Sequence, residues 1–540
     1  MAYYDGHSII VLFGLRYSKK MKAKKNSLLA PTFKVTLLSM LNMAVTFITQ
    51  IIISYHFGAS AERDAYFVVT AIPIYVSSIL SSSLSVTFIP IFVENETNKN
   101  ETEAWKIASI FMNFIFLALS GLSIIGIIFA RQIIALITPG FSGEMQVLTS
   151  SLLRIMMPTI VLNGLSNLLS SIYYAEYRYV QPGLSTIINS AVMLISVVLM
   201  RSLGVYSLAI GFLLGSFANF LILTPIVFTS GKYIFSFDIR HPAVKRIIQV
   251  MSPLIFFGAF YNSVKLLEKY FASSLSVGSI SYLGYGNKII LVLNSLAING
   301  ISVTIFPLMA RSWAVNDMAG VRKYFAKGVR GILLIAMPIS AIFIALGVPI
   351  IQFLFERGSF DHATTVAVAN VLSILMVTFV SAGLGNVVGK GFYIAQETNK
   401  RAMLGIFLIG VYYVLAWVFS KQFSYIGLAV ATSLHSIIGL AITTAIMRRL
   451  YGGINGMEIL NGFLKITISS FLSGIVMYIS YFFNGFIDII AVKLMISVIL
   501  GGIVYYIMIF RIFRLPEVQG INGAIIDFMK KKLGLKKLEK

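Results

Sequence analysis

Long apolar runs recur along the chain from residue 33 to residue 512, and only short polar segments separate them. Each run has about twenty or more residues, enough to cross roughly 30 Å of hydrocarbon as an α-helix. The runs lack the strict alternation of apolar and polar positions that marks the strands of a membrane β-barrel. Because lipid cannot hydrogen-bond to exposed backbone groups, this pattern predicts an all-α polytopic membrane protein.

The positions of the runs predict about fourteen transmembrane helices. The expected spans are 33–56, 65–92, 107–130, 147–174, 183–203, 205–229, 247–271, 280–308, 331–355, 363–395, 402–420, 424–447, 462–483 and 486–510. Each of these helices is long enough to cross the hydrocarbon core of a bilayer by itself. We refer to them below as spans 1 to 14, in chain order.

The two halves of the chain resemble each other. The segment Ser85–Pro90 (SVTFIP) matches Ser302–Pro307 (SVTIFP), and Gly164–Asn167 (GLSN) matches Gly383–Asn386 (GLGN) at nearly the same offset along the chain. Six spans separate the matching elements, so the second copy crosses the membrane in the same direction as the first. The sequence therefore predicts two parallel six-helix repeats followed by two C-terminal helices.

These elements predict how the chain is divided. The expected parts are a basic cytoplasmic segment (1–32), the first repeat (33–229), a cytoplasmic linker (230–246), the second repeat (247–447), two further transmembrane helices (448–512) and a basic amphipathic cytoplasmic tail (513–540). Near the N-terminus an apolar stretch precedes the basic cluster, which is the reverse of a secretory signal, so we expect no cleaved signal. The residues around Met21 are typical of a cytoplasmic start.

Composition agrees with a membrane location and excludes several classes of site. Hydrophobic residues make up 58% of the 540 positions and charged residues 12%, whereas soluble domains carry about 25% charged residues. There is no cysteine, so disulfides and thiolate metal sites are excluded. The five histidines are scattered, and no carboxylate pair, metal-ligand cluster or phosphate-binding glycine loop is present. We therefore expect a transporter rather than an enzyme, with no catalytic residue, metal or cofactor.

The net charge of +23 reflects topology. Of the 43 Lys and Arg residues, the expected outer segments carry only Arg63, Arg131, Arg201, Arg357 and Lys421. This asymmetry follows the positive-inside rule and predicts a bacterial cytoplasmic (inner) membrane protein with both termini in the cytoplasm. Basic residues at the inner face attract anionic lipids, so we expect membrane lipids, not nucleic acid, as their partners.

Charged residues inside spans are costly and are therefore candidates for function. Lys265, Glu268 and Lys269 have the i, i+3, i+4 spacing of one helix face in span 7, and Lys288 lies early in span 8. Their net positive charge suits an anionic substrate such as a pyrophosphate head group. The alternative is that span 7 pairs its own charges while its lysines extend to the interface. Weaker candidates for the same substrate are Arg154 and Lys390.

Several motifs resemble one known family of membrane proteins. They are Phe57-Gly58-Ala59, Asp64-Ala65-Tyr66-Phe67-Val68, Phe88-Ile89-Pro90, Leu354-Phe355-Glu356-Arg357-Gly358-Ser359-Phe360 and Gly391-Phe392-Tyr393-Ile394-Ala395-Gln396-Glu397-Thr398. In this order they are similar to the MurJ/MviN family of the MOP flippase superfamily, over roughly residues 33 to 510. The resemblance implies a flippase that moves a polyprenyl-pyrophosphate-linked sugar precursor, lipid II in the named members, from the inner to the outer leaflet.

The resemblance also implies roles for two pairs of residues. Glu268-Lys269 looks like the acidic-basic pair of span 7, whose acid is linked to a cation site in the family. Asn287-Lys288 looks like the Asp-Arg pair of span 8, whose base contacts substrate. We therefore expect Lys265, Lys269, Lys288, Asn287, Arg154 and Lys390 to bind substrate and Glu268 and Asp64 to couple to an ion. Asp64 lies at the end of a span, where capping of a helix is the simpler alternative.

The sequence departs from the family at several positions. Family members that flip lipid II carry arginines in the first two spans, and the corresponding stretches here contain Met43, Thr49-Gln50 and Ser77-Ser78. The span 11 asparagine of the cation site has no counterpart in the run 410–419. These departures leave open a flippase for a capsule, O-antigen or exopolysaccharide repeat unit. Two further alternatives are a MATE-like cation-coupled exporter and a polysaccharide polymerase or ligase, which would need a large outer loop that the sequence lacks.

We expect this flippase to work by alternating access, with the two repeats rocking against each other. A monovalent cation or the membrane potential would supply the driving force, because a charged head group that crosses the membrane couples to the field directly. Its partners would be the lipid-linked glycan and membrane lipids. We expect it to function as a monomer.

Overall fold

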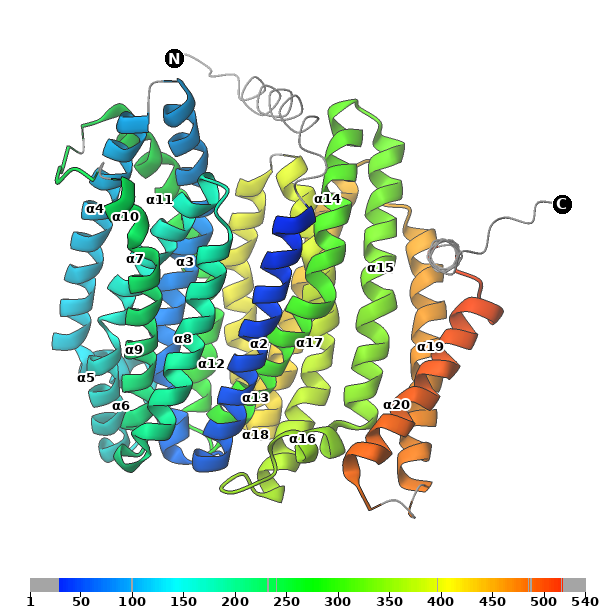
Figure 1. Cartoon of the computed structure of the whole chain (residues 1–540). Helices are drawn as coiled ribbons and strands as arrows, with labels where there is room; N and C mark the ends of the chain where they lie inside the picture. Colours follow the sequence, from blue (N-terminus) through cyan, green and yellow to red (C-terminus); the bar gives the residue numbers. More distant parts are fainter. Residues whose placement is uncertain are drawn as a thin grey trace. The chain divides into compact units, whose positions relative to one another are not determined.

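The structure is a computed structural model, which describes residues 29–98, 101–230, 233–238, 240–395, 397–483, 485, 488–515 and 517. Most of the expected N-terminal segment and C-terminal tail, with the expected start at Met21, lies outside the described residues. Within the described ranges the chain consists of helices joined by short connections (Figure 1). The expectation of an all-α membrane protein is confirmed.

The helices fall into two series along the chain. The first series is α2 (Leu29–Phe57), α3 (Ala61–Asn98), α4 (Glu101–Ile128), α5 (Ala130–Ile137), α6 (Gly143–Met156), α7 (Thr159–Ala175), α8 (Val180–Leu199), α9 (Tyr206–Leu223) and α10 (Pro225–Ser230). The second is α11 (Pro242–Asn262), α12 (Val264–Ala272), α13 (Ser279–Leu293), α14 (Asn299–Ala314), α15 (Met318–Ala345), α16 (Gly347–Phe355), α17 (His362–Ile394) and α18 (Thr398–Leu450). Two more helices follow, α19 (Gly456–Phe483) and α20 (Ile490–Ile507).

Twelve helices within the described residues are long and apolar enough to cross a membrane. Two predicted spans account for the difference from fourteen. Spans 11 and 12 are merged into α18, whose helical backbone is interrupted at Ser424 (φ 54°, ψ −135°). Span 8 is formed by α13 and α14, between which the residues Asn294–Ile298 make a π-helical turn. Over the described residues, each of the fourteen predicted spans is therefore mainly helical.

The backbone repeats the duplication that the sequence predicts. Helices α3 and α13 begin at equivalent positions of the two repeats, Ala61 and Ser279, and so do α4 and α15, at Glu101 and Met318. Gly204, which separates α8 from α9, has φ 56° and ψ −137°. These are nearly the angles of Ser424, which separates the corresponding helices of the second repeat. The order of helices and connections along the chain is therefore repeated, as the duplicated sequence predicts.

Packing divides the chain into two compact units that do not coincide with the repeats. Unit 1 comprises Met1–Gln50, Leu80–Ile127 and Ile155–Ser252, and unit 2 comprises Ile51–Ile79, Ile128–Arg154 and Pro253–Lys540. Unit 2 therefore contains two pieces of the first repeat together with the whole second repeat from residue 253 onward. Every residue proposed for the site, from Asp64 to Lys390, lies in unit 2.

In unit 1, the linker between the repeats runs along α4. The Asn113 side chain donates to the carbonyl group of Ser236 (3.0 Å) and accepts from the hydroxyl of Tyr233 (2.6 Å). Closer to the start of α11, the ring of His241 contacts the Glu103 carboxylate at 2.8 Å. These contacts attach the described part of the linker to the first repeat.

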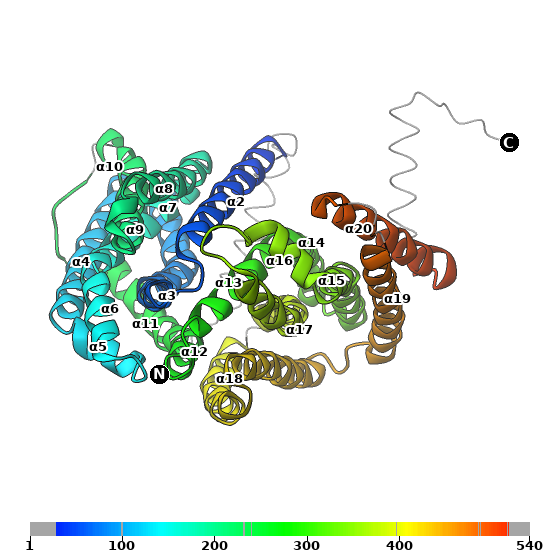
Figure 2. The ribbon, with the colours of Figure 1, turned by 90° about the horizontal axis from the view of Figure 1, so that it is seen from below.

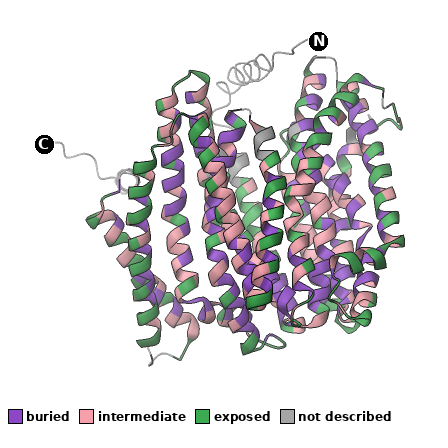
Figure 3. Ribbon diagram, turned by 180° about the vertical axis from the view of Figure 1, so that it is seen from behind, coloured by how far each residue is buried: buried purple, intermediate pink, exposed green. Residues whose placement is uncertain are grey.

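In unit 2, α17 packs against α13, α15 and α18, and α19 packs against α15 and α20 (Figures 1 and 2). The buried Arg330 of α15 contacts the carboxylates of Glu458 in α19 and Glu517, each at 2.6 Å. Large apolar side chains are exposed on many helices, for example Phe116 and Leu117 of α4 and Phe471 and Tyr478 of α19. Figure 3 shows that exposed positions occur along most of the helices. Such side chains suit contact with lipid chains rather than water.

Candidate functional site

The candidate site is formed by α12, α13 and the beginning of α3, all within unit 2. Span 7 is divided into α11 and α12 at Ser263, and a short turn that ends at Gly278 (φ 91°) leads into α13. This left-handed conformation favours glycine. The turn brings α12 and α13 together, so that their polar side chains can meet inside the unit.

Glu268 lies at the centre of a buried polar group. It is 6% exposed and Lys269 is 7% exposed. The Lys269 ammonium donates to Oε1 of Glu268 at 2.9 Å. Asn287 of α13 donates its amide hydrogens to the same carboxylate, at 3.2 Å from Oε2 and 3.4 Å from Oε1. The structure thus brings together three of the residues that the sequence singled out.

Lys265, which was expected on the same face, is exposed. Lys265 thus differs from Glu268 and Lys269, which are buried, although all three lie in the same short helix. Of the weaker candidates, Arg154 is exposed near the end of α6. Lys390 is half-buried in α17, where its Nζ lies 5.9 Å from the ring centroid of Phe306.

Lys288 shares an aromatic neighbour with a second cation. Its Nζ lies 5.5 Å from the ring centroid of Phe67, and the guanidinium of Arg63 lies 4.2 Å from the same centroid. Arg63 is fully buried and also lies 5.4 Å from the ring centroid of Tyr285. Rings hold cations in this way through their negative faces.

Sequence reasoning missed Arg63 because it placed the start of span 2 at residue 65. The helix α3 begins at Ala61, so Arg63 lies in its first turn. A signal was present, since Tyr66 and Phe67 follow Arg63 at i+3 and i+4, the spacing of neighbours on one helix face.

Asp64 joins α3 to the first turn of α13. Its carboxylate is 4% exposed and accepts from the N–H groups of Gly278 and Ser281, both at 2.7 Å, and from the Ser281 hydroxyl at 2.5 Å. An acidic group in this position satisfies free N–H groups and complements the positive end of the helix dipole. The geometry is that of the capping alternative, with the cap supplied by another helix.

Further contacts surround this cap and link segments from the two repeats. The hydroxyl of Tyr285 donates to the carbonyl of Gly58 (2.7 Å), and the N–H of Ser359 donates to the carbonyl of Tyr55 (2.8 Å). A side chain at Gly58 would overlap the carbonyl of Ser359. We call these contacts, with those of Asp64, the inter-repeat seam.

A reciprocal contact occurs between the equivalent elements. The N–H of Gly140, the counterpart of Gly358 in the first repeat, lies 3.3 Å from the hydroxyl of Ser273. In each repeat, the turn that follows the third span therefore contacts the end of the first span of the other repeat. The seam is therefore a paired arrangement of the duplicated elements.

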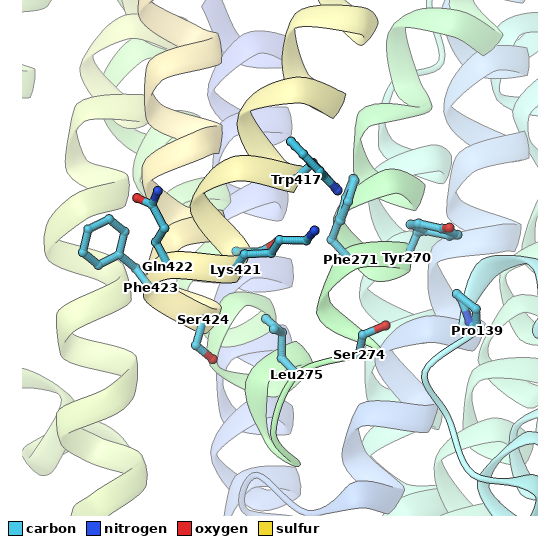
Figure 4. A pocket seen from close by; sticks show the side chains of 11 residues that line it. Pro139, Tyr270, Phe271, Ser274, Leu275, Trp417, Lys421, Gln422, Phe423 and Ser424 are labelled. Carbon is cyan, nitrogen blue, oxygen red and sulfur yellow. The ribbon is translucent and has the colours of Figure 1, made fainter.

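Two pockets lie near these residues within unit 2. One has a volume of about 580 Å³ and is lined by residues of α12 and α18, among them Tyr270, Phe271 and Trp417 (Figure 4). Lys421 extends across it, with its Nζ 4.3 Å from the Trp417 ring centroid. The other, of about 460 Å³, borders the inter-repeat seam and is lined by polar groups that include Glu62 and Asp361.

Comparisons with known proteins agree with this fold. Residues 53–498 match the family model described as "Lipid II flippase MurJ". A "Probable lipid II flippase MurJ" of Buchnera aphidicola is 27% identical over 433 residues, which cover 79% of this chain and 84% of the relative. The "Lipid II flippase MurJ" of Thermosipho africanus is 23% identical over 465 residues, which cover 85% and 93%.

Solved structures show the same architecture. One titled "Lipid II flippase MurJ, inward closed conformation" has a TM-score of 0.76 at 22% identity, and the match covers 89% of this chain and 98% of that one. An inward-facing multidrug resistance MATE family transporter of the MOP superfamily has a TM-score of 0.64 at 14% identity, with 76% and 95% covered. At these identities the likeness concerns the fold.

Proposed function

The chain belongs to the lipid II flippase MurJ family, and we propose that it translocates a polyprenyl-pyrophosphate-linked glycan precursor, lipid II or a relative of it, from the inner to the outer leaflet of the bacterial cytoplasmic membrane. The observation that carries the proposal is the family match over residues 53–498. The duplicated helical fold supports it, because two parallel halves can move against each other around a central path. Such a protein is a transporter, not an enzyme.

Lys288 is the cation that we propose as the main contact of the substrate phosphates. Lys269 is engaged by the Glu268 carboxylate, whereas Lys288 faces an aromatic ring and so keeps its ammonium hydrogens available for an anion. A charge-assisted bond to phosphate is stronger than a neutral one. We propose Lys265, Arg154 and Lys390 as secondary contacts during passage of the head group.

The inter-repeat seam supports a gating role in this cycle. We propose that the seam lies on the outer side of the membrane, with both termini in the cytoplasm as the distribution of Lys and Arg predicts. Alternating access requires such contacts to form and break once per cycle. Hydrogen bonds suit this purpose, since each neutral one contributes only about 0.5–1.5 kcal/mol net and each one to the Asp64 carboxylate about 1.5–3 kcal/mol.

The identity of the glycan is the part of the proposal that needs a direct test. The family arginines of spans 1 and 2 are replaced here, and two of the replacing residues, Thr49 and Gln50, are buried. A flippase for a capsule, O-antigen or exopolysaccharide repeat unit is therefore the second candidate. A MATE-like exporter of cations fits less well, because the buried acid Glu268 is already paired with a lysine.

Complementation separates these functions. The full chain is expressed in a bacterium depleted of its own lipid II flippase, and growth is scored. Rescue of growth supports transport of lipid II. The second candidate is supported if the chain is present in the membrane but does not rescue this strain, and does rescue a strain that lacks a repeat-unit flippase. Replacement of Lys288 and Lys269 together by alanine should abolish flipping in vesicles, and unchanged flipping would reject the residue assignment. We propose that the monomer is the active form. The size of the active protein in detergent tests this proposal.

A further inference from the structure

The buried carboxylate of Glu268 is the place where family resemblance leads one to expect a coupling cation. Whether a metal ion fits there depends on the groups around the carboxylate. The ammonium of Lys269 lies 2.9 Å from Oε1, and the amide of Asn287 bridges both oxygens. The carboxylate oxygens are therefore already engaged by donors on the side of α12 and on the side of α13.

A hard cation needs several oxygen ligands. Asn287 presents its NH₂ group to the carboxylate rather than its carbonyl oxygen, because an amide oxygen placed there would be repelled by the carboxylate. Within the residues that the structure describes, no group of three or more His, Cys, Asp or Glu side chains could hold a metal ion. On the sides of α12 and α13, Glu268 therefore meets hydrogen-bond donors where a metal ion would need oxygens. The buried Tyr412 of α18 also lies near this carboxylate.

The charge of Lys269 also occupies the position of a bound cation. Its side chain is 9% exposed and that of Glu268 is 8% exposed, so water screens the two charges little. A second positive charge beside the same carboxylate would meet repulsion that is strong at low dielectric. The residues around Glu268 therefore do not fit a metal cation while Lys269 is in place.

We propose that the ammonium of Lys269 is the resident cation of this site. Glu268 and Asn287 form a site for a monovalent cation, and the protein fills it with its own lysine. Consequently, the transport cycle does not depend on the uptake of Na⁺ or K⁺ at Glu268. The thermal test below does not depend on the proposed function, whereas the transport test does.

The first test uses thermal unfolding of the purified full chain in detergent near pH 8, with NaCl or KCl replaced by choline chloride at constant ionic strength. The wild-type protein should show the same Tm in all three salts. Lys269→Met leaves Glu268 without its partner, so its Tm should fall in choline chloride and rise saturably with Na⁺ or K⁺. The additional change Glu268→Gln should remove this response.

The matched control is Lys323→Met, the same change at an exposed lysine of α15, which should respond to salts as the wild type does. A wild-type Tm that rises saturably with Na⁺ or K⁺, and loses this rise in Glu268→Gln, would overturn the proposal. A folded Lys269→Met variant without a cation response would overturn it as well. If that variant does not fold, the comparison of wild type with Glu268→Gln decides alone.

The second test measures flipping of a fluorescent polyprenyl-pyrophosphate glycan in proteoliposomes held at one membrane potential. Equal rates in NaCl and in choline chloride support the resident cation. A rate that falls in choline chloride, and whose Na⁺ dependence is lost in Glu268→Gln, overturns it. Absence of flipping in both salts contradicts the proposed function instead, and the thermal data then still decide the inference.

Discussion

Asp64 accepts two hydrogen bonds from Ser281, one from its main-chain N–H at 2.7 Å and one from its hydroxyl at 2.5 Å. The two residues lie far apart along the chain, in α3 and α13, and so belong to different repeats. A single carboxylate therefore ties the first turn of α3 in one repeat to the first turn of α13 in the other.

Replacement of Asp64 by alanine should destabilise the protein by about 1–3 kcal/mol, because buried N–H groups of Gly278 and Ser281 lose their acceptor. Asp64→Asn should lose less, since an amide oxygen can still accept one of these bonds. Thermal unfolding in detergent measures the difference. Asp488→Ala, at an exposed aspartate, is the matched control and should leave the Tm unchanged. Equal losses from both alanine variants would contradict the role of the cap.

A covalent bond across the seam should stop transport. Tyr55 and Ser359 are joined by a main-chain hydrogen bond of 2.8 Å, so their backbones lie close enough for a disulfide between the two positions to be tried. The chain has no cysteine of its own, so the double variant Tyr55→Cys/Ser359→Cys gives a clean background. Oxidation should abolish flipping in vesicles and a reducing agent should restore it.

The two single-cysteine variants are the controls for this experiment. Each should flip at the same rate before and after oxidation. Full activity of the oxidised double variant, with the cross-link verified by mass, would show that the seam does not open during transport.

Lys288→Ala should lower the flipping rate at limiting substrate by about tenfold or more, since a hydrogen bond to a charged group is worth about 1.5–3 kcal/mol. Lys288→Arg keeps the charge and should retain part of the activity. Flipping measured over a range of substrate concentrations separates weaker binding from slower movement. An alanine variant with wild-type rates and wild-type Tm would exclude Lys288 as a substrate contact.

Most of the fold could be predicted from the sequence because lipid cannot hydrogen-bond to exposed backbone groups, which restricts the structures that can cross a membrane. Apolar runs long enough to cross the membrane are expected to be helices, and the described residues of each expected span are mainly helical. The repeat was visible in matches such as Ser85–Pro90 with Ser302–Pro307. The π-helical turn within span 8 was not predictable, because hydropathy reports where a helix lies but not how its hydrogen bonds are arranged.

The candidate site was predicted less completely. Glu268, Lys269 and Asn287 were singled out, yet helical spacing alone grouped Lys265 with them, and burial separates it. Periodicity gives the face of a helix, but what covers that face depends on helices distant in sequence. Arg63 was missed because span 2 was predicted to begin at residue 65, and its contact with Tyr285 of the other repeat could not be read from the sequence.

The two C-terminal helices should depend on one buried arginine. Arg330 of α15 contacts Glu458 and Glu517 at 2.6 Å each, so Arg330→Ala would leave the buried Glu517 carboxylate without its counter-charge. Loss of one partner of a buried ion pair costs about 3–5 kcal/mol, and partial exposure of Glu458 places the expected loss at the lower end. Thermal unfolding measures the loss, and Arg449→Ala, at an exposed arginine, is the control. A variant as stable as the control would show that apolar packing alone holds these helices.

Helix α17 should owe part of its stability to an ionised cap. Asp361 precedes the helix, and its side chain accepts from the N–H of Thr364 at 2.8 Å. Hydrogen bonds from Thr364 lower the pKa of Asp361 below its ordinary value of 3.8. A lowered pKa in the folded state means that the carboxylate stabilises the fold fully above that ordinary value, and that this contribution is lost as the pH falls through the lowered one.

Asp361→Ala should therefore cost about 0.5–2 kcal/mol at neutral pH, the usual loss of an N-cap, whereas Asp361→Asn keeps an acceptor and should cost less. The decisive measurement is the Tm of the wild type and of Asp361→Asn between about pH 7 and pH 3. Because asparagine does not ionise, the advantage of the wild type should shrink as the pH falls below the ordinary pKa of an aspartate. An advantage that stays constant over this range would show that the cap acts through hydrogen bonding alone, without a contribution from its charge.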